Sequence, residues 1–186
     1  GAAGQLGSAI SKVFSESHIE LTALTRAGFD ADLDTVPVRL APYRGYDYLI
    51  NCIAYHKVDQ CEDNPEQSFK INAELVFNLA RFCAANKSTL IHIGTDYVFD
   101  GLKREPYVEQ DPPSPLNVYG VSKLAGEMFA RAYAPKHFVL RVSSMFGEKA
   151  PNSTNVNFAE KMVDAARRGE PLKVIDDQFM SPTYAE

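Results

Sequence analysis

Tyr48-Leu-Ile-Asn-Cys-Ile-Ala54 and Thr89-Leu-Ile-His-Ile-Gly94 are two short apolar runs typical of buried strands. Between them, Pro65 stands where the first turn of a helix would begin. Apolar side chains then recur at helical spacing through Cys83: Phe69, Leu75, Val76, Leu79 and Phe82. A strand, a helix and a second strand in this order predict a parallel sheet with a helix packed on its face.

The same alternation extends to both sides of this unit. Residues 4–15 read as a helix, and 19–24 as a strand. Four prolines make 105–117 a loop, and it is followed by a helix, a strand, a helix and a strand at 117–133, 138–142, 158–168 and 172–175. We therefore predict an α/β fold of the doubly wound, Rossmann type, with one domain over residues 1–186. Because the chain begins on a glycine motif, we expect the first strand of the sheet to lie outside these residues.

The composition narrows the class of protein. Of 186 residues, 45% are hydrophobic and 23% charged, and the formal net charge is -5. This charge favours neither a nucleic-acid nor a membrane partner, and no apolar run approaches the roughly 20 residues that span a bilayer. The three cysteines, Cys52, Cys61 and Cys83, form no CxxC pair. Reduced thiols in a cytoplasmic protein are the expected state.

Gly1-Ala-Ala-Gly4-Gln-Leu-Gly7 is a GxxGxxG pattern that leads into a helix. Such glycines permit a tight turn and close backbone approach to a pyrophosphate, and the helix N-terminus supplies amides. The pattern predicts an NAD(P)-binding Rossmann-like domain. An NAD-selective site usually offers an acidic residue near the end of the next strand, where this chain has Arg26, and Asp30 comes slightly later. Arg26 either binds a 2′-phosphate, which favours NADP, or is a solvated surface arginine. The choice between NADPH and NADH stays open. The four histidines lack metal-ligand spacing, and no metal site is expected.

Tyr119 and Lys123 are four residues apart and therefore share one face of the expected helix. Thr95 follows directly after the strand 89–94, at the end of a parallel strand where such sheets bind ligands. An ammonium near a phenol stabilises the phenolate, so we expect Lys123 to lower the pKa of Tyr119. Tyr119 would then protonate a carbonyl oxygen held by Thr95 while hydride reaches the carbon.

The sequence resembles the dTDP-4-dehydrorhamnose reductase family, within the extended short-chain dehydrogenases/reductases, over essentially its whole length. The glycine loop and the block Thr95-Asp-Tyr-Val-Phe-Asp-Gly101 carry much of this resemblance. Further matching segments are Asn51–Tyr55, Val58-Asp59, Pro115–Gly120, Lys123–Glu127, Arg141–Gly147, Asn157–Ala159, Asp176–Gln178 and Ser181–Thr183. The family reduces the 4-keto group of a nucleotide-linked deoxysugar with NAD(P)H, converting dTDP-4-dehydro-rhamnose to dTDP-rhamnose.

The resemblance implies roles for individual residues. Thr95, Tyr119 and Lys123 match the catalytic trio, and Lys123 also holds the nicotinamide ribose. The implied cofactor contacts are Gly1, Gly4, Gln5, Leu6, Asp30, Ala31, Ile53, Ala54, Tyr55, Tyr119 and Lys123, to which the charge argument adds Arg26. The implied substrate contacts are Thr95, Asp96, Tyr119 and Ser144.

Three departures from the family pattern bear on these roles. Ser144 stands where an aromatic residue often faces the sugar, which leaves the exact sugar open. Ala9 replaces a glutamate that helps hold a metal at a dimer interface, so a homodimer stays open but a metal-linked one is not supported. Only the beginning of the family's carboxyl-terminal substrate lobe is expected, roughly at 145–186.

Two other functions are compatible with the same motifs. One is a nucleotide-sugar epimerase or dehydratase of the same superfamily, which would retain NAD without net turnover. The other is a non-catalytic NADP-binding subunit similar to the regulatory beta subunit of methionine adenosyltransferase, whose partner would be a protein.

Overall fold

A computed structural model describes residues 1–26, 36–148, 158–172, 174, 176–177 and 179–185. The chain forms two compact units. One runs from Arg26 to Val142, and the other combines Gly1–Thr25 with Ser143–Glu186. Each unit is described here by itself.

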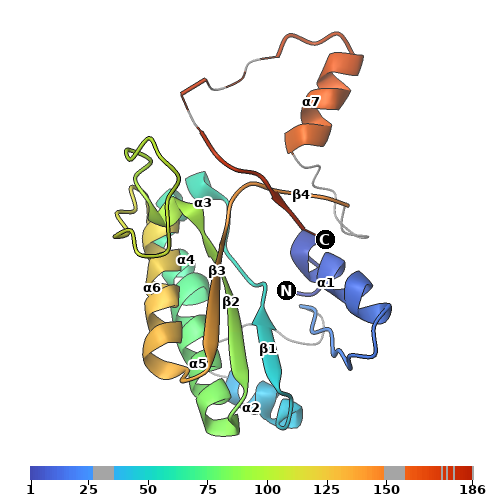
Figure 1. The fold of residues 1–186 in the computed structure, drawn as a ribbon, viewed down its shortest axis with the longest axis vertical. Coiled ribbons are helices and arrows are strands. Elements are labelled where there is room, and N and C mark those ends of the chain that lie inside the picture. Colours follow the sequence, from blue (N-terminus) through green and yellow to red (C-terminus); the bar gives the residue numbers. More distant parts are fainter. Residues whose placement is uncertain (27–35, 149–157, 173, 175, 178, 186) are drawn as a thin grey trace. The chain divides into compact units, whose positions relative to one another are not determined.

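The Arg26–Val142 unit is built on a three-stranded parallel sheet in the order β1-β2-β3 (Figure 1). Its strands are β1 (Tyr48–Asn51), β2 (Thr89–Thr95) and β3 (His137–Val142). In the register, Asn51 of β1 lies opposite His92 of β2, and Thr95 lies opposite Val142 of β3. The carboxyl ends of all three strands therefore point the same way, and the side chains that follow them gather at one edge.

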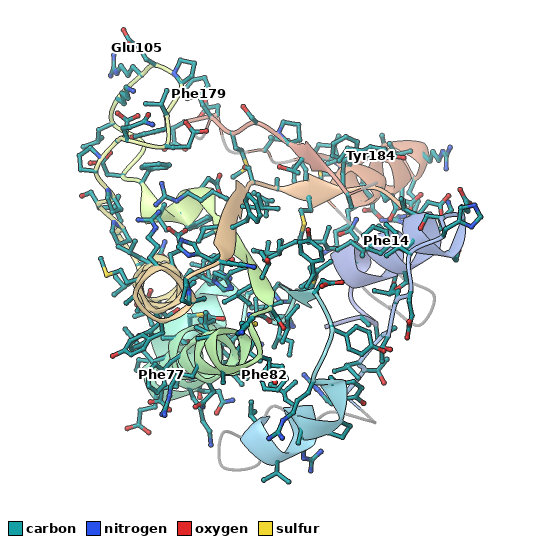
Figure 2. The ribbon with its side chains drawn as sticks, turned by 60° about the horizontal axis from the view of Figure 1, so that its bottom comes forward. Phe14, Phe77, Phe82, Glu105, Phe179 and Tyr184 are labelled. Carbon is teal, nitrogen blue, oxygen red and sulfur yellow. The ribbon has the colours of Figure 1, made fainter. Side chains whose placement is uncertain are left out.

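Helices cover one face of this sheet in Figure 1. A continuous helical run consists of α4 (Pro65–Phe69), the π-helical segment η2 (Lys70–Glu74) and α5 (Leu75–Asn86), and α6 (Val118–Tyr133) packs beside it. Fully buried Leu75, Val76 and Leu90 belong to the core between helices and sheet. Phe77 of α5 is labelled in Figure 2. Its ring lies against those of Phe129 and Tyr133 of α6, with centroids 5.3 and 4.7 Å away.

Local polar contacts fix where α6 begins. Asn117 accepts a hydrogen bond from the Gly120 N–H at 2.8 Å, as an N-cap residue does. The carboxylate of Glu62 accepts from the Val118 N–H at 2.7 Å, which also favours the positive end of the helix. Shorter elements complete the unit: α2 (Val36–Leu40), η1 (Ala41–Tyr43), α3 (Val58–Asp63) and η3 (Asp96–Val98).

The second unit contains α1 (Gln5–Ser15), α7 (Phe158–Arg167) and a parallel pair of two-residue strands, β4 (Met145–Phe146) and β5 (Thr183–Tyr184). The nitrogen atoms of Gly1 and Ala2 donate to the Leu24 carbonyl oxygen at 3.3 and 3.2 Å. Lys12 of α1 pairs with Glu148 at 2.8 Å.

The parallel α/β fold expected from the sequence is confirmed, and the seven-residue β2 and the long helices lie close to their expected bounds. The strand expected at 19–24 is wrong. Leu24 accepts two backbone hydrogen bonds, but the segment pairs with no strand among the described residues. Leu172 and Val174 likewise lie outside any strand, and Val174 is exposed. In the described part of the chain, no helix is both long and apolar enough to cross a membrane.

Candidate active site

The end of β2 presents the first two candidate side chains. Thr95 is the last residue of the strand and is 4% exposed, and Asp96 opens the tight turn η3. The Thr95 hydroxyl accepts a hydrogen bond from the Tyr97 N–H at 3.2 Å and donates one to the Asp96 carboxylate at 3.3 Å. These contacts hold the hydroxyl at the edge of the sheet where ligands bind in folds of this class.

Tyr119, on the first turn of α6, lies beside Thr95. The ring of Tyr97 meets that of Tyr119 edge-on, with centroids 5.5 Å apart. Burial raises the pKa of Tyr119 above its ordinary value, and the nearby Thr95 side chain opposes this change. The expected lowering of that pKa is therefore wrong for the chain alone, because burial outweighs the stabilisation of the phenolate.

Lys123 lies one helical turn after Tyr119 and is 2% exposed. Its ammonium donates a hydrogen bond to the carbonyl oxygen of Ile93 in β2. Burial lowers the pKa of Lys123 to about 8, and the nearby Glu127 and Cys52 act in the opposite direction. An ammonium has three N–H donors, so one of them anchors Lys123 to the sheet while the group keeps further capacity for a ligand hydroxyl.

The loop after β1 carries Ile53, Ala54 and Tyr55. Asn72, at the centre of the π-helical segment and 1% exposed, holds this loop. Its side-chain oxygen accepts from the Tyr55 N–H and its amide donates to the Tyr55 carbonyl oxygen, both at 2.9 Å. The same amide reaches the Ser122 hydroxyl at 3.0 Å, and Ser122 donates to the Tyr119 carbonyl oxygen at 2.8 Å. One buried side chain thus connects the expected cofactor loop to the helix that carries Tyr119.

Asn51 and His92 form a second buried pair that supports the same loop. Asn51 accepts a hydrogen bond from the Ile53 N–H at 3.0 Å, so its amide faces His92 Nδ1 at 3.2 Å. Burial keeps the pKa of His92 well below its usual range, and the ring is neutral at pH 7. Among the described residues, His92 Nε2 has no hydrogen-bond partner, so only one nitrogen of the buried ring is satisfied.

Sequence reasoning missed Ser122 and Asn51 as supports of the site. Ser122 receives a hydrogen bond from Asn72, 50 residues away, and the Asn51 amide meets His92, 41 residues away, so no local pattern reveals these contacts. The available signals were a polar residue inside an apolar helix face and a polar residue at the end of a buried strand.

The glycine turn is described within its own unit. The Gly4 N–H donates to the Gly1 carbonyl oxygen at 3.0 Å, and α1 follows directly with Gln5 and Leu6 in its first turn. A Cβ at Gly7 would overlap the Gly1 carbonyl oxygen and lie 2.6 Å from the Ala2 Cα. No side chain caps α1 and no acidic residue lies in its first turn. A tight turn followed by uncapped amides fits the phosphates of a dinucleotide.

The structure does not bring every predicted residue into one described site. Arg26 is exposed, while Asp30 and Ala31 lie outside the described residues. Ser144 is exposed and belongs to the other unit, where its carbonyl oxygen accepts from the Thr183 N–H at 3.0 Å. Among the residues that the structure describes, no three His, Cys, Asp or Glu side chains converge as they would around a metal ion.

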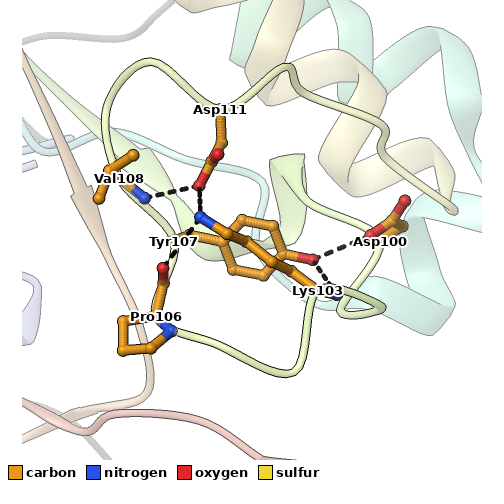
Figure 3. Close-up of polar contacts among 6 residues, drawn as sticks. All are labelled: Asp100, Lys103, Pro106, Tyr107, Val108 and Asp111. Atoms are coloured by element: carbon orange, nitrogen blue, oxygen red, sulfur yellow. Dashed lines mark hydrogen bonds and ion pairs between the residues drawn. The ribbon is translucent and has the colours of Figure 1, made fainter.

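The proline-rich loop after Thr95–Val98 is held by a polar network (Figure 3). The Tyr107 hydroxyl donates to Asp100 at 2.9 Å and accepts from the Lys103 N–H at 3.3 Å. Lys103 Nζ pairs with Asp111 at 2.6 Å, and the rings of Phe99 and Tyr107 stack with centroids 4.1 Å apart. A segment predicted only as a loop therefore has its own internal contacts beside the candidate site.

Comparison with known proteins agrees with this arrangement. A family model described as the RmlD substrate binding domain matches residues 1–186. The chain belongs to this family. The dTDP-4-dehydrorhamnose reductase of Sinorhizobium fredii is 34% identical over 183 residues, which are 98% of this chain and 60% of that relative. The enzyme of the same name from Mycolicibacterium smegmatis is 37% identical over 185 residues, covering 99% of this chain and 55% of the relative.

A solved structure extends the likeness to three dimensions. The crystal structure of dTDP-4-dehydrorhamnose reductase from Bacillus anthracis, in complex with NADP, superposes with a TM-score of 0.90 at 33% identity, covering 100% of this chain and 64% of that one. The resemblance to the dTDP-4-dehydrorhamnose reductase family is confirmed. The chain spans about 55–64% of the length of these relatives.

Proposed function

We propose that the protein containing this chain is an NAD(P)H-dependent oxidoreductase that reduces the 4-keto group of a nucleotide-linked deoxysugar, dTDP-4-dehydro-rhamnose to dTDP-rhamnose. The observation that carries the proposal is that Thr95 lies beside Tyr119 and lowers its pKa, with the buried ammonium of Lys123 one helical turn away. The reductases of the same family support the substrate, and the NADP in the Bacillus anthracis relative supports NADPH as the cofactor.

The roles follow from the chemistry of the three groups. A bound NAD(P)H supplies the hydride. The hydroxyl of Thr95, already fixed by the turn after β2, orients the keto oxygen, and Tyr119 gives its proton to that oxygen as the carbon is reduced. Because burial raises the pKa of Tyr119, the phenol holds its proton at neutral pH and is in the form that a reduction needs. The Lys123 ammonium stabilises the phenolate left behind.

The cofactor would be held by the glycine turn and by the loop after β1. Gly1, Gly4, Gln5 and Leu6 would face the pyrophosphate, and Ile53, Ala54 and Tyr55 would line the cofactor beyond β1. Asn72 supports this role, since it clamps both backbone groups of Tyr55. Asp96 and Ser144 are the proposed sugar contacts, and Arg26, Asp30 and Ala31 the proposed contacts at the adenosine end.

The test is absorbance at 340 nm with the complete protein, NADPH or NADH, and enzymatically generated dTDP-4-dehydro-rhamnose. Steady oxidation of one cofactor is expected. Tyr119→Phe should lower kcat by about 10²–10⁴-fold, with cofactor affinity nearly unchanged. Tyr133→Phe, an exposed tyrosine on the same helix, is the matched control and should keep wild-type turnover.

Other outcomes would point to the alternatives. A flat trace together with NAD released on denaturation would indicate an epimerase or dehydratase. A flat trace with capture of a defined protein partner would indicate a regulatory subunit. Wild-type turnover in Tyr119→Phe would remove the proposed proton donor even if the reduction occurs.

A further inference from the structure

Glu127 is a fully buried carboxylate one helical turn after Lys123. Both side chains project from the sheet-facing side of α6, and Glu127 has 0% exposure. A buried carboxylate is costly unless it is paired and hydrogen-bonded. Its presence next to a buried lysine therefore calls for a physical explanation.

The Glu127 carboxylate is held in place from the sheet. The Nε of Arg141, in β3, donates to both Glu127 oxygens at 3.1 Å, and its Nη2 donates to one of them at 2.8 Å. Arg131 lies 3.6 Å from the same carboxylate. A Cβ at Gly94 would lie 2.6 Å from a Glu127 oxygen and 3.2 Å from the Arg141 Cγ, so the glycine in β2 leaves the space for the pair.

The other titratable groups that face Lys123 are neutral at pH 7. The Cys52 thiol after β1 has a pKa raised by burial, His92 of β2 has a pKa well below its usual range, and the pKa of Tyr119 is raised. Arg141 is itself cationic and donates to the Glu127 carboxylate. Among these described neighbours, Glu127 alone carries negative charge, and it opposes the effect of burial on Lys123.

We propose that Glu127, anchored by Arg141, is a positioning residue that keeps Lys123 in its ammonium form at neutral pH. The inference rests on the proposed function only for the use that the reaction makes of the ammonium. Arg141 of β3 fixes the carboxylate one helical turn from Lys123, and Lys123 in turn donates to the Ile93 carbonyl oxygen of β2. Glu127 touches neither cofactor nor substrate in this account and acts through Lys123.

The test is a pH titration of Lys123 in the complete, cofactor-free protein. It is monitored by NMR of lysine labelled with ¹³C at Cε. The Lys123 signal is assigned by its loss in Lys123→Met. Glu127→Gln is nearly isosteric and should lower the titration midpoint by about one pH unit or more. This measurement does not depend on catalysis, so it stands whether or not the sugar is reduced.

Arg141→Gln is the matched control, because it breaks the same ion pair but removes a cation in place of an anion. Its titration midpoint should not fall. Should either single variant fail to fold, Glu127→Leu combined with Arg141→Met replaces the pair by apolar groups, a change that buried ion pairs often tolerate. The midpoint should again fall, since the nearer anion is gone.

The pH profile of kcat/KM should shift in the same direction as the NMR titration midpoint. If the reduction occurs, the alkaline limb of kcat/KM should move to lower pH in Glu127→Gln by the amount measured in the NMR titration, while kcat/KM at pH 6 changes little. An unchanged midpoint in Glu127→Gln would overturn the proposal. An equal fall in Arg141→Gln would also overturn it, because both variants would then act through lost structure and not through charge.

Discussion

Replacing Lys123 by methionine should make the cofactor-free protein more stable at neutral pH. Burial lowers the pKa of Lys123 from 10.5 to about 8. This difference of about 2.5 corresponds to about 3 kcal/mol at 1.36 kcal/mol per pKa unit. Methionine also loses the hydrogen bond to Ile93, worth about 1 kcal/mol, so the free energy of unfolding should rise by about 2 kcal/mol.

The pH dependence gives the sign of this effect a separate test. Between pH 8 and 10.5 the unfolded chain binds more protons at Lys123 than the folded one, so wild-type stability gains with rising pH in that window. Below pH 8 the cost of the buried ammonium is present in full. The advantage of Lys123→Met should therefore shrink from about 2 kcal/mol at pH 7 to less than about 1 kcal/mol at pH 9.5.

Urea unfolding of both proteins at pH 7 and pH 9.5 measures these differences. Lys136→Met, at an exposed position just before β3, is the matched control and should change stability by no more than about 0.5 kcal/mol at either pH. A Lys123→Met variant that is less stable than wild type at pH 7 would refute the reasoning, because it would show that the ammonium contributes to folding.

Three further perturbations test the supports of the site. Asn72→Ala should lower the free energy of unfolding by about 2–3 kcal/mol and speed hydrogen exchange at the Tyr55 amide, because it leaves buried backbone groups unpaired. The control Asn86→Ala loses one local hydrogen bond and should lower it by about 1 kcal/mol or less, so equal losses would contradict the role of Asn72. Gly126→Ala should destabilise by about 1–3 kcal/mol in chemical unfolding, since its Cβ would overlap the Asn72 carbonyl oxygen; a more stable variant, as helix propensity alone predicts, would contradict the packing. Lys103 holds the pKa of Asp111 below its ordinary 3.8, so the loop contact is present at neutral pH and is lost as pH falls through the lowered pKa. Amide exchange in this loop should be faster in Asp111→Asn at pH 7, and unchanged exchange would count against the contact.

The sequence was sufficient for the parallel fold because its strongest signals are local. Strand β2 and helix α6 each combine a periodic pattern with a clear boundary: Thr95 ends the strand, and Asn117 caps the helix. The segment 19–24 has the same apolar alternation as a strand but lacks a described partner, and a strand exists only through pairing. Alternation alone could not distinguish the two cases.

The candidate site was predictable in its positions but not in its electrostatics. Spacing placed Tyr119 and Lys123 on one helical face, and the structure brings Thr95 to them. The direction of the Tyr119 pKa could not be read from that spacing, because it depends on how much water the fold removes from the phenol. The hydrogen bonds of Asn72 to Tyr55 and Ser122 also depend on the fold, since these partners lie 17 and 50 residues away in the sequence.

The glycines around α6 explain how this unit buries two opposite charges one helical turn apart. At Gly120 and Gly126 a Cβ would overlap the carbonyl oxygens of Tyr97 and Asn72, so the helix packs directly against backbone there. Gly94 leaves space in β2 for the carboxylate of Glu127. Close packing removes water from Lys123. It also buries the Glu127 carboxylate in the same low-dielectric interior, where opposite charges interact strongly. Enlarging any of these glycines should therefore disturb the charge of Lys123 as well as the packing, and the NMR titration of Lys123 in Gly94→Ala would separate the two effects.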